Sequence, residues 1–162
     1  MLYNLLMGYE PATLPFSERT APRHRLHAWV LAVPLVSFPL LSLFHWNPIY
    51  PAILAMTFGA LATLFCRADL ASKVGVGAIL FLGYYTVFLL GIELTAPDYI
   101  ERVWNLPAFS GLEIAGLPIE ELLFAAAFGA YWSGVYEHFT WNRTVSPKQR
   151  RERASHESGL ES

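Results

Sequence analysis

The chain has 162 residues, enough for one domain, with a formal net charge of −2 and a single cysteine. Hydrophobic residues make up 54% of it and charged residues only 15%, whereas a soluble domain carries about 25% charged residues. This composition indicates an integral membrane protein. It excludes an intramolecular disulfide framework, and the lack of a broad basic face gives a nucleic-acid partner no support.

Four apolar stretches are long enough to cross a bilayer as helices, which takes about 20 residues. They cover about residues 26–46, 48–66, 74–95 and 117–139. Pro34 and Pro39 are expected to bend the first helix, and the short turn before residue 48 is expected to make the first two an antiparallel hairpin. We therefore predict an all-α membrane bundle of about four transmembrane helices over residues 1–141, with a polar, disordered tail at residues 142–162.

Nearly all the positive charges fall on one side of such a bundle. They precede the first span, separate the second from the third, and follow the fourth, at Arg19, Arg23, Arg25, Arg67, Lys73, Arg143, Lys148, Arg150, Arg151 and Arg153. Only Arg102 lies on the other side, in the loop at residues 96–116. The positive-inside rule then predicts that both termini are cytoplasmic and that the loop is on the outer side. We expect that loop to be either a short interfacial helix or an ordinary loop, with Tyr99 and Trp104 at headgroup depth.

Two adjacent carboxylates, Glu120 and Glu121, open the fourth span directly after Pro118. Ionisable groups at a hydrocarbon boundary are costly to keep, which makes them candidates for function. The structural alternative is a helix start, where proline and acidic residues are favoured without any chemistry. Adjacent helical residues diverge by about 100° around the axis, so one glutamate can face the bundle while its neighbour faces a second helix.

Glu93 lies near the outer end of the third span, which the topology brings beside the start of the fourth. We therefore expect Glu93, Glu120 and Glu121 at similar depth, and we take all three as candidate catalytic residues. Crowded carboxylates in apolar surroundings allow one to stay protonated as a general acid while another accepts a proton.

Aromatic side chains recur at helical spacing along the third and fourth spans. The stripes are interpreted either as packing or as a channel for a long apolar ligand, in which the ring faces stabilise a cation. The candidate substrate-binding residues are Pro118, Phe124, Phe128, Tyr84, Tyr85, Trp104 and Tyr131.

No metal site is predicted from the sequence. The histidines His24, His27, His45, His138 and His156 are scattered over both sides of the bundle, and His138 is expected to be interfacial. Cys66 is interpreted as a small apolar side chain at a helix end, without a partner cysteine for a Cys-based zinc site. A phosphate loop, a dinucleotide fingerprint and a serine nucleophile motif are all missing.

Two strings of residues carry a resemblance to a known family. They are Glu101-Arg102-Val103-Trp104-Asn105 and Ile114-Ala115-Gly116-Leu117-Pro118-Ile119-Glu120-Glu121-Leu122-Leu123-Phe124. Together they resemble the lycopene cyclase domain, the small membrane domain of bacterial heterodimeric and fungal fused carotenoid cyclases. The family's Gly-x-Pro-x-Glu-Glu-x-Leu-Phe motif opens a transmembrane helix, and its positions are filled here by Gly116, Pro118, Glu120, Glu121, Leu123 and Phe124. The resemblance covers about residues 74–141, and the first two spans match only as generic apolar helices.

The resemblance implies an enzyme of the intramolecular lyase or isomerase type in the bacterial inner membrane. Such cyclases protonate the end of a linear polyene, close a ring and release a proton, with no cofactor and with Glu120 and Glu121 as acid and base. The implied partners are an apolar polyene substrate and the lipid bilayer. The family commonly combines two such domains, and this chain has one motif copy, so a second cyclase-domain subunit or self-association is expected.

Two other functions remain open from the residues alone. The first is a non-catalytic membrane subunit or scaffold in which the glutamates only cap a helix. The second is an intramembrane protease of a family that has an arginine four residues after the second glutamate. This chain has Ala125 at that position, which argues against the protease.

Overall fold

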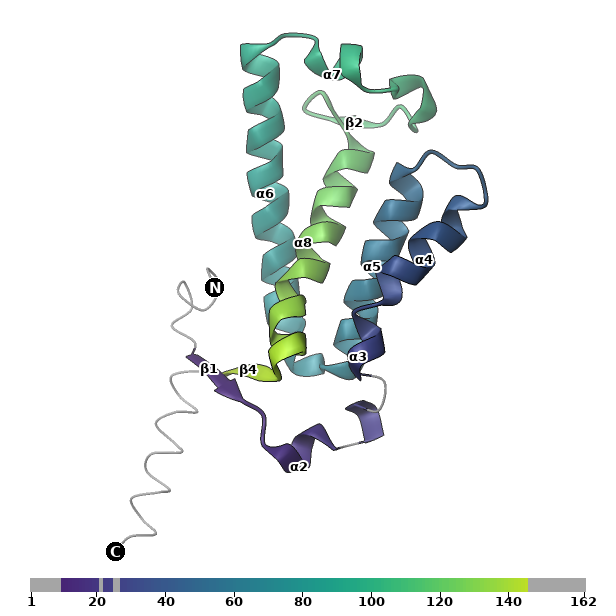
Figure 1. The fold of residues 1–162 in the computed structure, drawn as a ribbon. Helices are drawn as coiled ribbons and strands as arrows, with labels where there is room; N and C mark the ends of the chain where they lie inside the picture. The colour runs from purple at the N-terminus through teal and green to yellow at the C-terminus, as the bar shows by residue number, and fades with distance from the viewer. Residues whose placement is uncertain (1–9, 21, 25–26, 146–162) are drawn as a thin grey trace, which may run out of the picture.

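Long α-helices dominate the chain in the computed structural model, which describes residues 10–20, 22–24 and 27–145. The bundle consists of α4 (Val33–Ser42), α5 (Ile49–Cys66), α6 (Ala71–Thr95) and α8 (Ile119–Thr140). The central helix is α8, which packs against both α5 and α6, while α4 packs on α5 (Figure 1). The predicted helical architecture is therefore confirmed.

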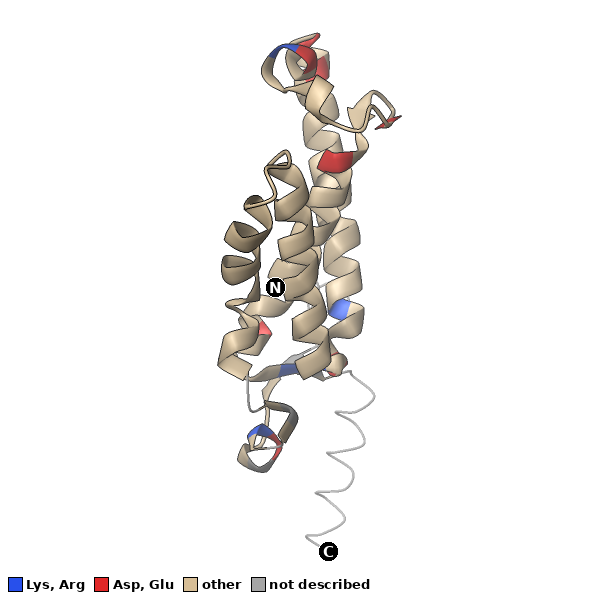
Figure 2. Ribbon diagram, turned by 90° about the vertical axis from the view of Figure 1, so that its right-hand side faces the viewer, with Lys and Arg blue, Asp and Glu red and all other residues tan. Residues whose placement is uncertain are grey.

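Two stretches among the described residues are long and apolar enough to cross a membrane, judged by length and composition. They are Ile49–Cys66 and Ala68–Thr95. Helix α8 has 22 residues but contains three glutamates and a histidine, and α4 has only 10 residues. The four predicted spans are therefore not confirmed. Charged residues nevertheless gather toward the two ends of the bundle, with mostly uncharged helix between them (Figure 2).

The first predicted span is divided into two helices. A short helix, α3 (His27–Val30), ends two residues before α4 begins at Val33. Pro34 lies in the first turn of α4, where a missing N–H and a fixed φ are tolerated, so it starts a new helix instead of bending a continuous one. Pro39 lies inside α4.

The connections between the long helices differ at the two ends. Ala68–Leu70 forms the 3₁₀ turn η2, which joins α5 to α6. The longer loop after α6 contains α7 (Tyr99–Val103), the 3₁₀ turn η3 (Leu106–Ala108) and a hairpin of β2 (Glu113–Ile114) and β3 (Leu117–Pro118). The loop at residues 96–116, for which the sequence allowed either a short helix or an ordinary loop, thus contains a short helix. Ile100 and Leu117 from this loop form a buried cluster with Leu89 of α6.

The hairpin turn explains the glycine of the sequence motif. Ala115 and Gly116 both have positive φ, 53° and 78°, as the two central residues of a tight hairpin turn require. Gly116 adopts this conformation without steric cost because it has no Cβ. The turn returns the chain directly into α8, and Pro118 is the N-cap of that helix.

The segments that precede and follow the bundle meet at its other end. Strand β1 (Glu10–Thr13) pairs antiparallel with β4 (Asn142–Val145), and α2 (Phe16–Arg19) and the 3₁₀ turn η1 (Pro22–His24) follow β1. The strand at residues 142–145 corrects the predicted start of the disordered tail. It forms because Trp141 ends α8 in the left-handed conformation and its carbonyl accepts a hydrogen bond from the N–H of Leu14, 2.9 Å away. Residues 146–162, with His156 and the four basic residues of the tail, lie outside the described residues.

Glycines allow the closest approach between α6 and α8. A Cβ added to Gly129 would lie 2.5 Å from the carbonyl oxygen of Gly77 and 2.6 Å from the Cβ of Phe81. A Cβ added to Gly77 would collide with Ser133. Small residues at such a contact are typical of helix pairs in membranes, where close van der Waals packing replaces the hydrophobic effect.

Candidate functional site

Glu120 lies buried at the junction of three segments. Its side chain, in the first turn of α8, is 2% exposed. The Oε1 atom accepts hydrogen bonds from the hydroxyl of Tyr50 on α5, at 2.9 Å, and from the backbone N–H of Ser110, at 2.7 Å. The Oε2 atom is also buried, and no described residue supplies it with a hydrogen-bond partner. The carboxylate therefore joins α8 to α5 and to the loop while keeping one oxygen available.

The hairpin positions the residues around Glu120. The N–H of Ile119 donates to the carbonyl of Leu112 at 2.9 Å, which holds the chain before β2 against the first turn of α8. This contact brings the N–H of Ser110 to the carboxylate. The site is therefore built by the turn at Gly116 as much as by the helix.

Glu121 points to a different neighbour. Its Oε2 accepts a hydrogen bond from the hydroxyl of Tyr85 on α6, at 2.8 Å, and its side chain is half-buried. Glu120 thus contacts α5 while Glu121 contacts α6, as the angular separation of adjacent helical residues predicts. The two carboxylates are adjacent in sequence but have separate hydrogen-bond partners.

Glu93 has a local role at the start of α7. Its carboxylate oxygens accept hydrogen bonds from the N–H groups of Asp98, at 2.6 Å, and Ile100, at 3.4 Å. These N–H groups belong to the N-terminal end of a helix, where a carboxylate is stabilising. The structure therefore ties Glu93 to the loop through these bonds, and its described hydrogen bonds do not join it to the glutamate pair.

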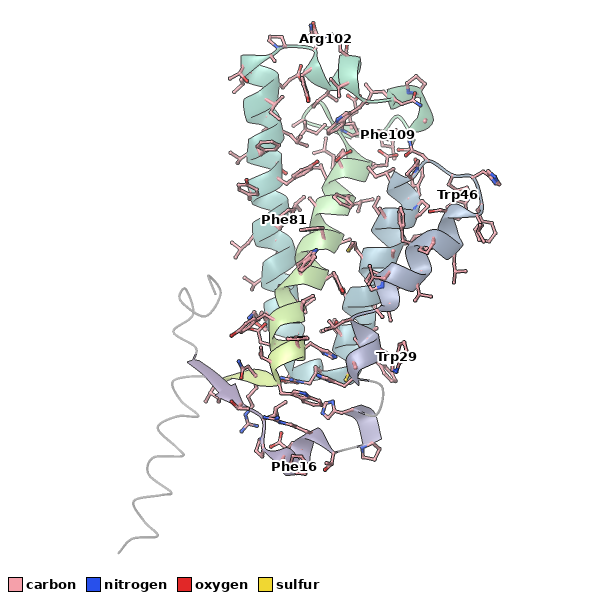
Figure 3. All side chains as sticks on the ribbon, in the orientation of Figure 1. Phe16, Trp29, Trp46, Phe81, Arg102 and Phe109 are labelled. Atoms are coloured by element: carbon pink, nitrogen blue, oxygen red, sulfur yellow. The ribbon has the colours of Figure 1, made fainter. Side chains whose placement is uncertain are left out.

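A cavity of about 420 Å³ opens beside Glu120. Its lining is almost wholly apolar, and Glu120, Tyr50 and Ser110 are the polar residues that contribute to it. The lining residues are Trp46, Tyr50, Ile53, Leu54, Ser110, Leu112, Ile119, Glu120 and Leu123. Figure 3 labels Trp46 at this end of α4. An apolar pocket with a few convergent polar groups is the usual form of a binding site for an apolar ligand.

Four of the predicted substrate-binding residues belong to one run of aromatic rings on α6 and α8. Phe128 is central, with ring centroids 4.9 Å from Phe81 and 5.8 Å from Phe124. Tyr85 stacks on Phe81 at 6.2 Å, and Tyr84 is 6.0 Å from the same ring (Phe81 is labelled in Figure 3). On α8 the run continues from Phe128 to Trp132, at 5.8 Å.

The other three predicted substrate-binding residues have packing roles. Tyr131 is 8% exposed, donates its hydroxyl proton to the carbonyl of Leu31 at 2.8 Å, and packs on Gly59. Trp104 packs against the buried cluster that contains Leu89, Ile100 and Leu117, and Pro118 is the buried N-cap of α8. The structure thus places them in the core and in the loop, and the ring of Tyr131 meets the end of the aromatic run at Trp132, with ring centroids 5.8 Å apart.

Tyr50 and Ser110 are site residues that the sequence reasoning missed. A signal for Tyr50 was present, because the second and fourth predicted spans begin on the same side of the bundle. Tyr50, at the start of the second span, is therefore at the same depth as Glu120, at the start of the fourth. The contact from Ser110 had no such signal, because the fold of the loop that brings its backbone N–H to Glu120 cannot be read from the sequence.

Histidines that the sequence placed on separate segments meet at the opposite end of the bundle. His24, His27 and Cys66 each offer a metal-ligand atom within 4.8 Å of the others. This grouping differs from the sequence-based expectation of scattered histidines and an apolar cysteine. It arises because η1 and the start of α3 lie against the end of α5.

Comparison with known proteins gives one match. No curated protein and no solved structure matches the chain. The family model described as lycopene cyclase matches residues 47–139. This range contains Tyr50, Tyr85, Ser110 and both adjacent glutamates, together with the hairpin that positions them. Since the match covers more than half of the 162 residues and confirms the resemblance seen in the motif, the chain belongs to the lycopene cyclase family.

Proposed function

We propose that the chain is a carotenoid (lycopene) cyclase, or a subunit of one, that closes a ring at the end of a linear polyene by acid–base catalysis. Its family membership supports a role related to carotenoid cyclisation. The observation that carries the proposal is the buried carboxylate of Glu120, with its Oε2 atom unpartnered among the described residues, beside an apolar cavity.

The reaction balances without a redox cofactor. A carboxylic acid donates its proton to the terminal carbon–carbon double bond, which leaves a tertiary carbocation. A second double bond of the same polyene attacks this cation, so that a carbon–carbon bond forms and the positive charge moves into the new ring. A carboxylate then removes a proton from a neighbouring carbon, which restores a double bond. One proton enters and one leaves, so substrate and product are isomers.

Glu120 and Glu121 are suited to share the two proton transfers, one as the acid that protonates the polyene and the other as the base that removes the proton. Glu120 contributes to the cavity lining, and its Oε2 atom is buried without a hydrogen-bond partner among the described residues, while its Oε1 atom is held by Tyr50 and Ser110. Glu121 is positioned from the other side by Tyr85. Two carboxylates with different surroundings are the usual arrangement for paired acid and base roles.

The aromatic rings support the cationic intermediate. Phe124 lies one helical turn after Glu120, and the rings of Phe128 and Phe81 follow it. A cation within about 6 Å of a ring face is stabilised by about 0.5–2 kcal/mol.

We place the protein in the cytoplasmic membrane with both termini on the cytoplasmic side. The two long apolar helices support membrane association. The β1–β4 end of the bundle carries Arg19, Arg67 and Arg143, and the end with Glu120 carries Arg102, so the positive-inside rule gives this orientation. A second cyclase-domain subunit, or a second copy of the chain, completes the unit in this proposal, because the chain has one copy of the glutamate motif.

The test is ring formation in cells that accumulate lycopene and express the chain with a family partner. Glu120→Gln and Glu121→Gln keep the size of each side chain and remove its carboxylate. Each should lower the cyclic product at least a hundredfold, within the range expected for a general acid or base. Glu113→Gln is the matched control, because Glu113 is exposed in the hairpin and should leave the yield unchanged. Full cyclic product from both glutamine variants would rule out the proposed roles.

One observation favours a second candidate, a non-catalytic membrane subunit. The bonds from Tyr50 and Ser110 to Glu120 join α5, α8 and the loop, and this is a structural task in itself. In that case Glu120→Gln would lower the melting temperature but leave the cyclic product made by the partner unchanged. Measuring pigment yield and melting temperature on the same variant separates the two functions.

A further inference from the structure

A cluster of potential metal ligands lies at the end of the bundle farthest from Glu120. His24 belongs to η1, His27 begins α3, and Cys66 is the last residue of α5. All three are buried, with exposed fractions of 5%, 8% and 3%. The acid–base chemistry proposed above does not use them, and both histidines precede residues 47–139, which match the family. They therefore need an account of their own.

The distances within the cluster suit a metal ion. The Nδ1 atoms of His24 and His27 lie 3.3 Å and 3.4 Å from the Sγ atom of Cys66. Zinc binds sulfur at about 2.3 Å and nitrogen at about 2.0–2.1 Å, so a tetrahedral ion holds a sulfur and a nitrogen about 3.6 Å apart. Both sulfur-to-nitrogen distances are thus within a few tenths of an ångström of this separation, and the ligand atoms of the two histidines lie within 4.8 Å of each other.

The surroundings of His27 already orient its ring as a ligand. Its Nε2 atom lies 2.6 Å from the carbonyl oxygen of His138. A carbonyl can only accept, so Nε2 carries the proton and the lone pair of Nδ1 faces the sulfur. The ring is also stacked between those of His138 and Trp141, at 3.7 Å and 3.6 Å. Metal-binding histidines typically donate their second N–H to a carbonyl or carboxylate in this way.

Space and a further nitrogen are available beside the cluster. A cavity of about 450 Å³ is lined by His24, His27 and His138, with Trp141 and apolar side chains. His138 is 0% exposed, and its Nδ1 atom has no hydrogen-bond partner among the described residues.

We propose that His24 Nδ1, His27 Nδ1 and Cys66 Sγ bind a zinc ion, with a fourth position that opens to this cavity. A thiolate with two imidazoles favours zinc over magnesium or calcium, which prefer oxygen ligands. Binding replaces the thiol proton, which is released to solvent. The ion joins the segment before the bundle to the end of α5, and the carbonyl of His138 extends the link to the last turn of α8.

The test uses the full chain in detergent, purified with a tag that contains no histidine. After equilibration with Zn²⁺ and removal of the excess, the wild type should retain about one zinc ion per chain. Cys66→Ser and His24→Gln should each lower the retained zinc at least tenfold. His45→Asn is the control, because His45 is exposed elsewhere in the bundle and its φ of 56° is one that asparagine tolerates. Zinc retained equally by Cys66→Ser and the wild type would overturn the proposal.

Cobalt gives a second, spectroscopic readout. Because Cys66 is the only cysteine, a sulfur-to-cobalt charge-transfer band in the wild type with Co²⁺ reports directly on this sulfur. We expect the band in the wild type and in His45→Asn, and its loss in Cys66→Ser. Far-ultraviolet circular dichroism of metal-free samples shows whether each variant has folded. A wild type without the band would mean that the cluster is a hydrogen-bonded thiol–imidazole group and not a metal site.

Discussion

Glu120 and Glu121 differ in what surrounds them, although they are neighbours in the same helical turn. Glu120 is almost fully buried, and its Oε1 atom is held by Tyr50 and Ser110, whereas Glu121 is half-buried and bonded to Tyr85. Each carboxylate therefore has one tyrosine that fixes its position, and the two tyrosines come from different helices. The roles of the pair can be probed through these tyrosines without removing either carboxylate.

Tyr50→Phe removes one hydrogen bond to Glu120 and keeps the aromatic ring. A hydrogen bond to a charged group contributes about 1.5–3 kcal/mol, so ring formation should fall about tenfold or more while the chain stays folded. The measurement is cyclic product per unit of protein in lycopene-accumulating cells. Tyr136→Phe is the control, since Tyr136, near the far end of α8, is 63% exposed and should leave the yield unchanged. A Tyr50→Phe variant with full yield would show that this bond does not position Glu120 for the reaction.

The buried pair of Lys73 and Glu137 shows how single residues hold the other end of the bundle. The Lys73 Nζ atom donates to the Glu137 Oε1 atom, and both side chains are at most 5% exposed. The pair joins α6 to α8 near the start of α6, which follows η2, and near the end of α8, which precedes β4. Removing one partner of such a pair leaves an uncompensated buried charge, which destabilises far more than removing both.

Lys73→Met should lower the free energy of unfolding by about 3–5 kcal/mol, measured by thermal or denaturant unfolding in detergent. The double variant Lys73→Met with Glu137→Leu should recover most of this loss, because no unpaired charge remains. If the single and double variants lose equal stability, the contribution comes from packing and not from the ion pair.

At the scale of elements, α8 is the organising helix. It packs on α6 through the contact of Gly129 with Gly77, and it packs on α5 with Gly134 close to Thr63 and Gly59 beneath Tyr131. Glycine at these positions lets the helix backbones approach closely, and that approach brings Tyr50 and Tyr85 within reach of the two glutamates. The geometry of the site therefore depends on contacts well away from it.

Gly129→Ala should separate α6 from α8 and lower the free energy of unfolding by about 1–3 kcal/mol, because the new Cβ meets backbone and Cβ atoms that cannot rotate away. Cyclic product should fall in parallel as Tyr85 moves from Glu121. Gly83→Ala is a matched control in α6, since a Cβ there meets nothing within 4 Å. That variant should be neutral or more stable, because alanine favours a helix over glycine. Equal effects from the two variants would contradict the close-contact argument.

At the scale of the whole molecule, the chain has two ends of different character. The end with β2, β3 and α7 carries the acidic site, and the end with β1, β4 and η1 carries most of the described basic residues and the histidine–cysteine cluster (Figures 1 and 2). Only α5 and α6 qualify as spans by length and apolar composition among the described residues. The structure nevertheless places Phe16 of α2 at the opposite end from Glu113 of β2. From this separation we predict that the α3–α4 segment and α8 also cross the membrane.

Labelling of introduced cysteines decides between two and four crossings. In intact spheroplasts, a membrane-impermeant maleimide should label Glu113→Cys, whereas Phe16→Cys should be labelled only after the membrane is permeabilised. Both positions are exposed, and labelling of buried Cys66 in the parent chain gives the background. Labelling of Phe16→Cys from outside would mean that only α5 and α6 cross the membrane.

Sequence alone determined the helical class, the ends of α5, α6 and α8 to within a few residues, the acidic pair and the family. These depend on composition, on apolar length and on a contiguous motif, all of which are local properties of the chain. Only the tertiary structure decided that Glu93 caps α7, that Tyr50 and Ser110 hold Glu120, and that Pro34 starts a separate helix. The same holds for the meeting of His24 and His27 with Cys66, which follows them by about 40 residues in the sequence. Such contacts follow from how helices dock over long sequence separations, and no short-range pattern specifies which face of one helix meets which face of another.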